Sequence, residues 1–178
     1  TDKNPYKNFV YTSFQEQATN VSHRRVATLV KKTGNSLLAK INGIIAADEA
    51  RHATAYSAFV QRIFELDPSQ MMTAFEDMMR RKIVMPAHFM RQTGDKAGEL
   101  WEHFSDAAQR TKVYTAQDYI DILSGLIKEW DIEHITDLNA AGEKARDYLM
   151  ALPDRLQRVT NRMKDPEKEY EFKWIGPH

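Results

Sequence analysis

Apolar residues recur along most of this chain at the three- and four-residue spacing of amphipathic helices, without a sustained two-residue alternation. The pattern predicts an all-α protein. A first helix is expected over about 9–32, because Gly34 and Asn35 then provide a normal helix stop signal. A second, unusually long helix is expected over about 36–66. The short connection predicts that these two helices are antiparallel neighbours.

After the second helix, Asp67 and Pro68 provide an N-cap followed by proline at the first helical position. Further helical segments are expected over 68–83, 99–111, 116–130 and 139–163. We interpret the chain as a single unit, in which residues 1–90 form bundle helices and residues 91–164 form additional packing helices. Residues 165–178 are expected to form a C-terminal tail.

The overall composition argues against several classes of function. The 178 residues carry 25 basic and 25 acidic side chains, so the charge balance gives no indication of a nucleic acid partner. Cysteine is absent, which excludes disulfides, zinc thiolate sites and a thiol nucleophile. No stretch approaches about 18 uncharged apolar residues, so we expect no membrane-spanning helix.

One Glu-x-x-His motif, formed by Glu49 and His52, lies in an apolar stretch of the second predicted helix. Side chains three residues apart share one helix face, with about 5–6 Å between their Cβ atoms. Ile45, Tyr56 and Phe59 lie on the same face, which suggests that it points toward a core. Burying a carboxylate and an imidazole is costly unless something pairs with them. An exposed ion pair on a solvated face is the alternative, and the pattern alone leaves both open.

The first predicted helix carries a matching polar stripe. Glu16, Thr19, Asn20 and His23 are spaced so that all four lie on one face. Glu16 lies about as far before the connection as Glu49 lies after it, so the two carboxylates are expected at a similar height in the bundle. Carboxylate oxygens with one imidazole suit iron or manganese.

Residues 11–19 read Tyr-Thr-Ser-Phe-Gln-Glu-Gln-Ala-Thr, and residues 44–56 read Ile-Ile-Ala-Ala-Asp-Glu-Ala-Arg-His-Ala-Thr-Ala-Tyr. These stretches resemble two metal-binding helices of the soluble acyl-[acyl-carrier-protein] desaturases, the plant stearoyl type. The similarity continues in order through 64–68, 78–88, 103–110 and 113–119. The resemblance implies a ferritin-like di-iron helical bundle. It places this chain in the C-terminal portion, which holds the second half of the ligand set and lacks the N-terminal helix pair.

The resemblance also implies roles for individual side chains near the iron ions. Glu16 would be a terminal carboxylate ligand, Glu49 a bridging carboxylate, and His52 the terminal imidazole of the same iron. Thr19 matches a threonine whose hydroxyl can deliver protons during oxygen chemistry. Three further residues are expected to orient the ligands without binding the iron themselves. These are His23, Asp48 and Arg51.

A second group of residues matches positions along the family's substrate channel. Thr1, Asn8 and Phe9 would lie beside the acyl chain, and Glu102 would lie near the channel mouth, where carrier protein docks. Asn8 stands where the plant enzymes have a glycine. This difference affects the expected chain length or double-bond position.

The activity implied by the resemblance is the introduction of a cis double bond into a saturated fatty acyl chain carried on acyl carrier protein. Removing hydrogen from unactivated C–H bonds with O₂ requires a metal oxidant, which no amino-acid side chain supplies. The expected partners are acylated carrier protein, reduced ferredoxin as the electron donor, and a second copy in a homodimer. We expect a soluble protein, in the cytoplasm if bacterial and in the plastid stroma if from a plant.

The chain departs from the family pattern in one respect. The family needs another Glu and another Glu-x-x-His from two earlier helices, whereas this chain contains a single Glu-x-x-His. One explanation is that these residues are the C-terminal half or two-thirds of a longer desaturase. The other is that two copies meet about a two-fold axis, each contributing Glu16, Glu49 and His52.

Two other functions are compatible with the same pattern. One is a non-catalytic ferritin-like bundle that binds or stores iron. The other is a helical interaction protein whose metal site is inactive. Binding of acylated carrier protein would separate a desaturase from an iron store.

Overall fold

The computed structural model describes residues 3–85, 88 and 99–164. Its helices are α1 (Pro5–Lys32), α2 (Ser36–Leu66), α3 (Pro68–Arg81), α4 (Glu99–Arg110), α5 (Ala116–Glu129) and α6 (Ala140–Thr160), with a short 3-10 helix, η2 (Ile132–His134). All regular elements within these described ranges are helical, which confirms the all-α prediction. Thr1 and the predicted tail over 165–178 lie outside the described residues. None of the helices within the described ranges is both long and apolar enough to cross a membrane.

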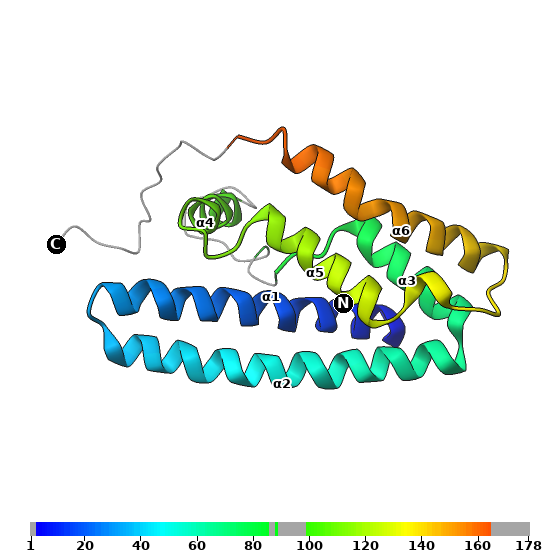
Figure 1. Cartoon of the computed structure of the whole chain (residues 1–178), viewed down its shortest axis with the longest axis horizontal. Coiled ribbons are helices and arrows are strands. Elements are labelled where there is room, and N and C mark those ends of the chain that lie inside the picture. The colour runs from blue at the N-terminus through cyan, green and yellow to red at the C-terminus, as the bar shows by residue number, and fades with distance from the viewer. Residues whose placement is uncertain (1–2, 86–87, 89–98, 165–178) are drawn as a thin grey trace.

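The dominant feature is the antiparallel pair of α1 and α2, which run side by side along the long axis (Figure 1). The turn between them uses Gly34 at φ 85°, a left-handed conformation that suits glycine. Asn35 then caps α2, because its side chain accepts a hydrogen bond from the backbone N–H of Leu38 at 3.0 Å. The predicted connection and the start of α2 are therefore confirmed.

Helix α1 begins earlier than the expected residue 9. The Asn4 side chain accepts hydrogen bonds from the backbone N–H groups of Tyr6 and Lys7, and Pro5 occupies the first helical position. This is the same N-cap and proline combination that correctly predicted the start of α3 at Asp67. The asparagine–proline pair was therefore a readable signal in the sequence.

The hydrophobic core lies between the α1–α2 pair and helices α3, α5 and α6, which lie on the α1 side of the pair (Figure 1). Its fully buried large side chains are Val10, Phe14, Val60, Met71, Met72, Phe75, Leu123, Leu126, Ile132 and Leu149. At its centre Trp130 packs edge-on against Phe75, with 5.0 Å between ring centroids. The Trp130 indole N–H donates to Ser57 Oγ at 2.8 Å, so the core contacts α2 through a satisfied polar group.

A second polar contact joins α1 to the start of α5. The Arg25 guanidinium binds the Asp118 carboxylate through both oxygens, at 2.5 and 2.6 Å. Asp118 also accepts from the backbone N–H and the hydroxyl of Thr115, which it caps reciprocally. Burial raises the pKa of Asp118, but the hydrogen bonds from Arg25 and Thr115 outweigh burial and hold that pKa below its usual value.

The opposite face of α2 is exposed, because no helix within the described ranges covers it (Figure 1). Five large apolar side chains of α2 keep 44–68% of their surface accessible, namely Leu37, Ile41, Ile44, Phe59 and Leu66. Of the residues that share the face of Glu49, Phe59 is exposed, whereas Ile45 and Tyr56 are half-buried, so the expectation that this face points into a core is wrong for Phe59 alone. An apolar helix face of this kind normally packs against a partner.

Replacing Asp118 with Asn should lower the free energy of unfolding by about 1 kcal/mol near neutral pH, because the buried carboxylate loses the charge that pairs with the half-exposed Arg25. A carboxylate with a depressed pKa stabilises the folded state above its unfolded pKa, and this contribution disappears as the pH falls through the folded pKa. Urea unfolding at neutral and strongly acidic pH measures both effects. Asp121→Asn, an exposed change on α5, is the control. Equal losses in both variants would contradict the role of Asp118.

Candidate metal centre

Glu16 on α1 and the pair Glu49 and His52 on α2 meet at one place in the structure. Their ligand atoms all lie within 4.8 Å of one another. His52 Nδ1 lies 3.3 Å from Glu16 Oε2 and 3.5 Å from Glu49 Oε2. The antiparallel connection places the three groups at the same height, as the spacing around the turn predicted. Two carboxylates and one imidazole nitrogen therefore converge from two helices.

The electrostatics of this group are unfavourable for two negative charges. Burial raises the pKa of Glu16, and a hydrogen bond with Glu49 and its negative charge raise it further, to about 7. The neighbouring imidazole of His52 lowers the pKa of Glu16 but does not cancel these effects. A cation between the carboxylates would remove this repulsion, so the donor set fits a divalent metal ion such as iron.

The site faces outward on the uncovered side of the α1–α2 pair. The side chains of Glu16 and Glu49 each keep 19% of their surface accessible, and that of His52 keeps 57%. Phe9, Tyr56 and Phe59 form an aromatic cluster two turns further along the same helices. The donors therefore sit on a surface that is apolar on one side and open to solvent.

The residues expected to support the ligands lie nearby but make other contacts. Asp48 and Arg51 form an ion pair with each other. The Thr19 hydroxyl lies 3.0 Å from the carbonyl oxygen of Gln15 and 3.1 Å from that of Glu16, to which it can donate. His23 contacts Asn42, and its Nδ1 lies 2.9 Å from Asn42 Oδ1. The roles expected for Asp48, Arg51, Thr19 and His23 stay predictions.

The expected channel residues are divided between two parts of the chain. Asn8 and Phe9 lie on α1, and the Phe9 ring centroid lies 5.7 Å from that of Phe59. Glu102 is an exposed residue of α4, on a helix with no buried side chain. Thr1 lies outside the described residues. The channel roles of Thr1, Asn8, Phe9 and Glu102 therefore stay predictions.

Asn42 is the residue of this neighbourhood that the sequence pattern did not single out. It is 7% exposed and bridges α2 to His23 of α1. Its position two turns before Glu49 on the same face was a usable signal, because a buried asparagine in an apolar stretch needs hydrogen-bond partners.

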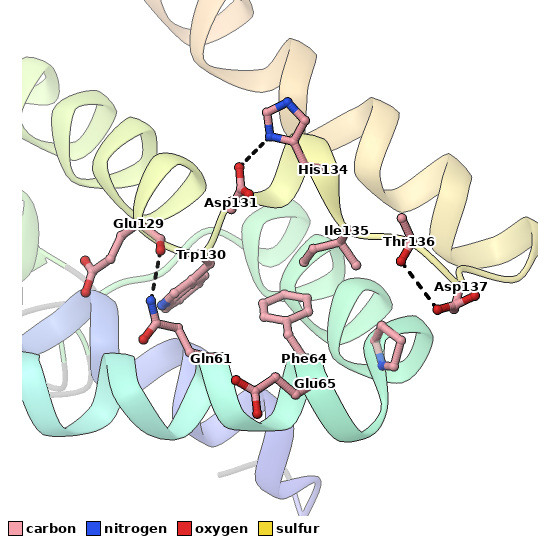
Figure 2. A pocket seen from close by; sticks show the side chains of 11 residues that line it. Gln61, Phe64, Glu65, Glu129, Trp130, Asp131, His134, Ile135, Thr136 and Asp137 are labelled. Atoms are coloured by element: carbon pink, nitrogen blue, oxygen red, sulfur yellow. Dashed lines mark hydrogen bonds and ion pairs between the residues drawn. The ribbon is translucent and has the colours of Figure 1, made fainter.

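A pocket of about 520 Å³ lies elsewhere, between α2, η2 and the connection to α6 (Figure 2). Phe64 and Trp130 form its apolar wall, and Glu65, Glu129 and Asp131 add carboxylates. Glu16, Glu49 and His52 are not among its lining residues. The candidate centre is therefore defined by converging donors rather than by this pocket.

The raised pKa of Glu16 predicts how stability of the metal-free protein varies with pH. A carboxyl whose pKa rises from 4.5 to about 7 stabilises the folded state at acidic pH, and this contribution is lost as the pH rises through 7. Glu16→Gln keeps a neutral side chain, so it should match the native protein near pH 5 and exceed its stability near pH 8, by on the order of 1 kcal/mol. Urea unfolding with a chelator present measures this. A constant difference across this range would contradict it.

Comparison with known proteins finds relatives that match nearly the whole chain. The model of the fatty acid desaturase family, whose fold is a ferritin-like di-iron helical bundle, matches residues 1–176. A chloroplastic stearoyl-[acyl-carrier-protein] 9-desaturase of Spinacia oleracea is 49% identical over 178 residues, covering 98% of this chain and 44% of the relative. Stearoyl-[acyl-carrier-protein] 9-desaturase 1 of Arabidopsis thaliana is 48% identical, with 98% of this chain and 45% of the relative covered.

A palmitoyl-[acyl-carrier-protein] 4-desaturase 3 of Ophrys sphegodes is 45% identical over 179 residues, again covering 98% of this chain and 44% of the relative. The chain thus spans about half the length of the curated relatives it matches. The similarity to acyl-[acyl-carrier-protein] desaturases expected from residues 11–19 and 44–56 is confirmed. This chain belongs to the fatty acid desaturase family.

Proposed function

We propose that this chain provides half of the di-iron centre of an acyl-[acyl-carrier-protein] desaturase. The observation that carries the proposal is the convergence of Glu16, Glu49 and His52 within 4.8 Å, in a chain of this family. A solvated surface pair would explain Glu49 and His52, but it would not explain a second carboxylate brought in from α1.

Glu16, Glu49 and His52 would hold the iron ions. When bound, the iron supplies the O₂-derived oxidant needed to remove hydrogen from unactivated C–H bonds of an acyl chain. The carboxylates contribute negative charge, and Glu16 must lose its proton when a cation binds, because its pKa is about 7 in the metal-free protein. The hydroxyl of Thr19, one turn after Glu16, would move protons at the same face.

The remaining ligands must come from outside these helices. We propose that two further helices with another Glu and another Glu-x-x-His cover the exposed face of α2. The large apolar side chains there, Ile41 and Phe59 among them, support this arrangement because they would otherwise stay solvated. A second copy facing the first about a two-fold axis would supply the same ligand types.

The substrate we propose is a saturated fatty acyl chain on acyl carrier protein, the carrier that appears in the names of the three relatives. The aromatic cluster of Phe9, Tyr56 and Phe59 gives an apolar surface beside the donors for such a chain. Reduced ferredoxin would supply the electrons, and the working form would be a homodimer. The names of these relatives support the plastid stroma as the compartment, and in a bacterium it would be the cytoplasm.

Replacing His52 with Ala in the complete protein should lower iron affinity at least about tenfold and remove desaturated product, because an iron ligand is lost. Iron analysis measures the first effect, and mass spectrometry of acyl chains after incubation with O₂ and reduced ferredoxin measures the second. His134→Ala is a matched control, because His134 is also an exposed histidine paired with a carboxylate three residues away. Unchanged iron content in the His52 variant would overturn the assignment.

Iron stoichiometry combined with intact mass separates the two sources of the missing ligands. A mass well above 20.6 kDa with about two irons per chain is expected if further helices complete the centre. One iron per chain in a dimer of 20.6 kDa subunits would instead support a centre assembled about a two-fold axis. A monomer without iron at that mass would contradict the two-fold arrangement and would indicate a half-site whose function belongs to a larger protein.

A further inference from the structure

We propose that His23, Asn42 and Asn20 act as a register clasp, a set of directional contacts that fixes how α1 lies along α2 and so holds Glu16 opposite Glu49 and His52. The inference rests on the proposed metal centre. The three clasp residues touch neither the proposed ligands nor a substrate position, so they are positioning residues.

The first contact of the clasp has a defined hydrogen-bond direction. Asn42 Nδ2 donates to the carbonyl oxygen of Leu38 at 3.0 Å, which leaves Asn42 Oδ1 pointing at His23. Nδ1 of His23 lies 2.9 Å from that oxygen and must therefore carry the proton. Both polar groups of a side chain that is 7% exposed are satisfied only when His23 lies at this height.

The second contact lies closer to the proposed ligands. Asn20 Nδ2 donates to the carbonyl oxygen of Ala46 at 2.6 Å. Asn20 follows Glu16 by four residues, and Ala46 precedes Glu49 by three, so this bond joins the turns next to the ligands on both helices. Each step back along α1, from His23 to Asn20 to Glu16, is matched by a forward step along α2.

The remaining side chains near this part of the interface constrain sliding less. Ala46 offers only a methyl group at the point where Asn20 approaches it, and the aromatic contacts of Phe9 beyond the ligands are not directional. A slip of one residue shifts a helix by about 1.5 Å and turns its face by about 100°, and a slip of one turn shifts it by about 5.4 Å.

Such a slip would destroy the donor group, because His52 Nδ1 lies only 3.3 and 3.5 Å from its two carboxylate neighbours. It would also leave the buried Asn42 side chain without its partner on α1. An unpaired buried polar group costs more free energy than its hydrogen bond contributes, so the clasp penalises the wrong registers more strongly than it stabilises the correct one.

The test compares two substitutions of Asn42 in the complete protein, with cobalt(II) as the metal probe. Asn42→Leu keeps the branched shape of the side chain and removes both polar contacts, whereas Asn42→Asp keeps an oxygen that accepts from His23. Asn42→Leu should weaken cobalt affinity at least tenfold and change the visible absorption of the bound ion. Asn42→Asp should stay within about twofold of the native affinity and keep its spectrum.

Val60→Ala controls for stability alone, because Val60 is a fully buried α2 residue that makes no polar side-chain contact. It should lower the urea midpoint yet leave cobalt affinity and spectrum unchanged. The clasp proposal is overturned if Asn42→Leu behaves like Val60→Ala, or if Val60→Ala weakens cobalt binding to the same degree. Unchanged cobalt binding in His52→Ala would identify a different failure, that of the metal centre itself, and would overturn the clasp proposal with it.

Discussion

The main constraint in this structure is that two carboxylates, one on each helix of the α1–α2 pair, are held close together at its surface. Glu16 and Glu49 lie near the same imidazole, and their mutual repulsion together with burial raises the pKa of Glu16 to about 7. The two carboxylates do not themselves stabilise this arrangement of the helices, because they repel each other. The rest of the fold must therefore impose it, and a cation can then relieve it.

Contacts on the opposite side of the pair fix both helices within the fold. Helices α3, α5 and α6 pack behind α1 and α2, and Trp130 and its bond to Ser57 connect that core to α2. Arg25 connects α1 to α5 through the buried Asp118 carboxylate. The back of the pair is thus well packed, whereas the front carries both the donors and the exposed apolar side chains of α2. This asymmetry supports the proposal that further helices cover the front of the pair.

Much of the helical organisation could be predicted because its signals are local. Apolar periodicity, the Gly34–Asn35 stop signal and the Asp67–Pro68 start signal correctly indicated α2 and the start of α3. The start of α1 was missed because the equivalent pair at Asn4 and Pro5 lies before the clearest apolar stretch. The expected burial of Phe59 was wrong because burial depends on which helices are present to cover a face, and helical periodicity does not report that.

The sequence by itself determined the ligand types and their shared height. Residues three apart on one helix must share a face, and a short turn makes equal distances from it coincide. Only the tertiary structure decided that Glu16 touches the imidazole of His52 and that His23 binds Asn42 rather than a ligand. Contacts of this kind depend on helix rotation and register. Those are set by packing and hydrogen bonds between residues far apart in the chain, so local spacing does not contain them.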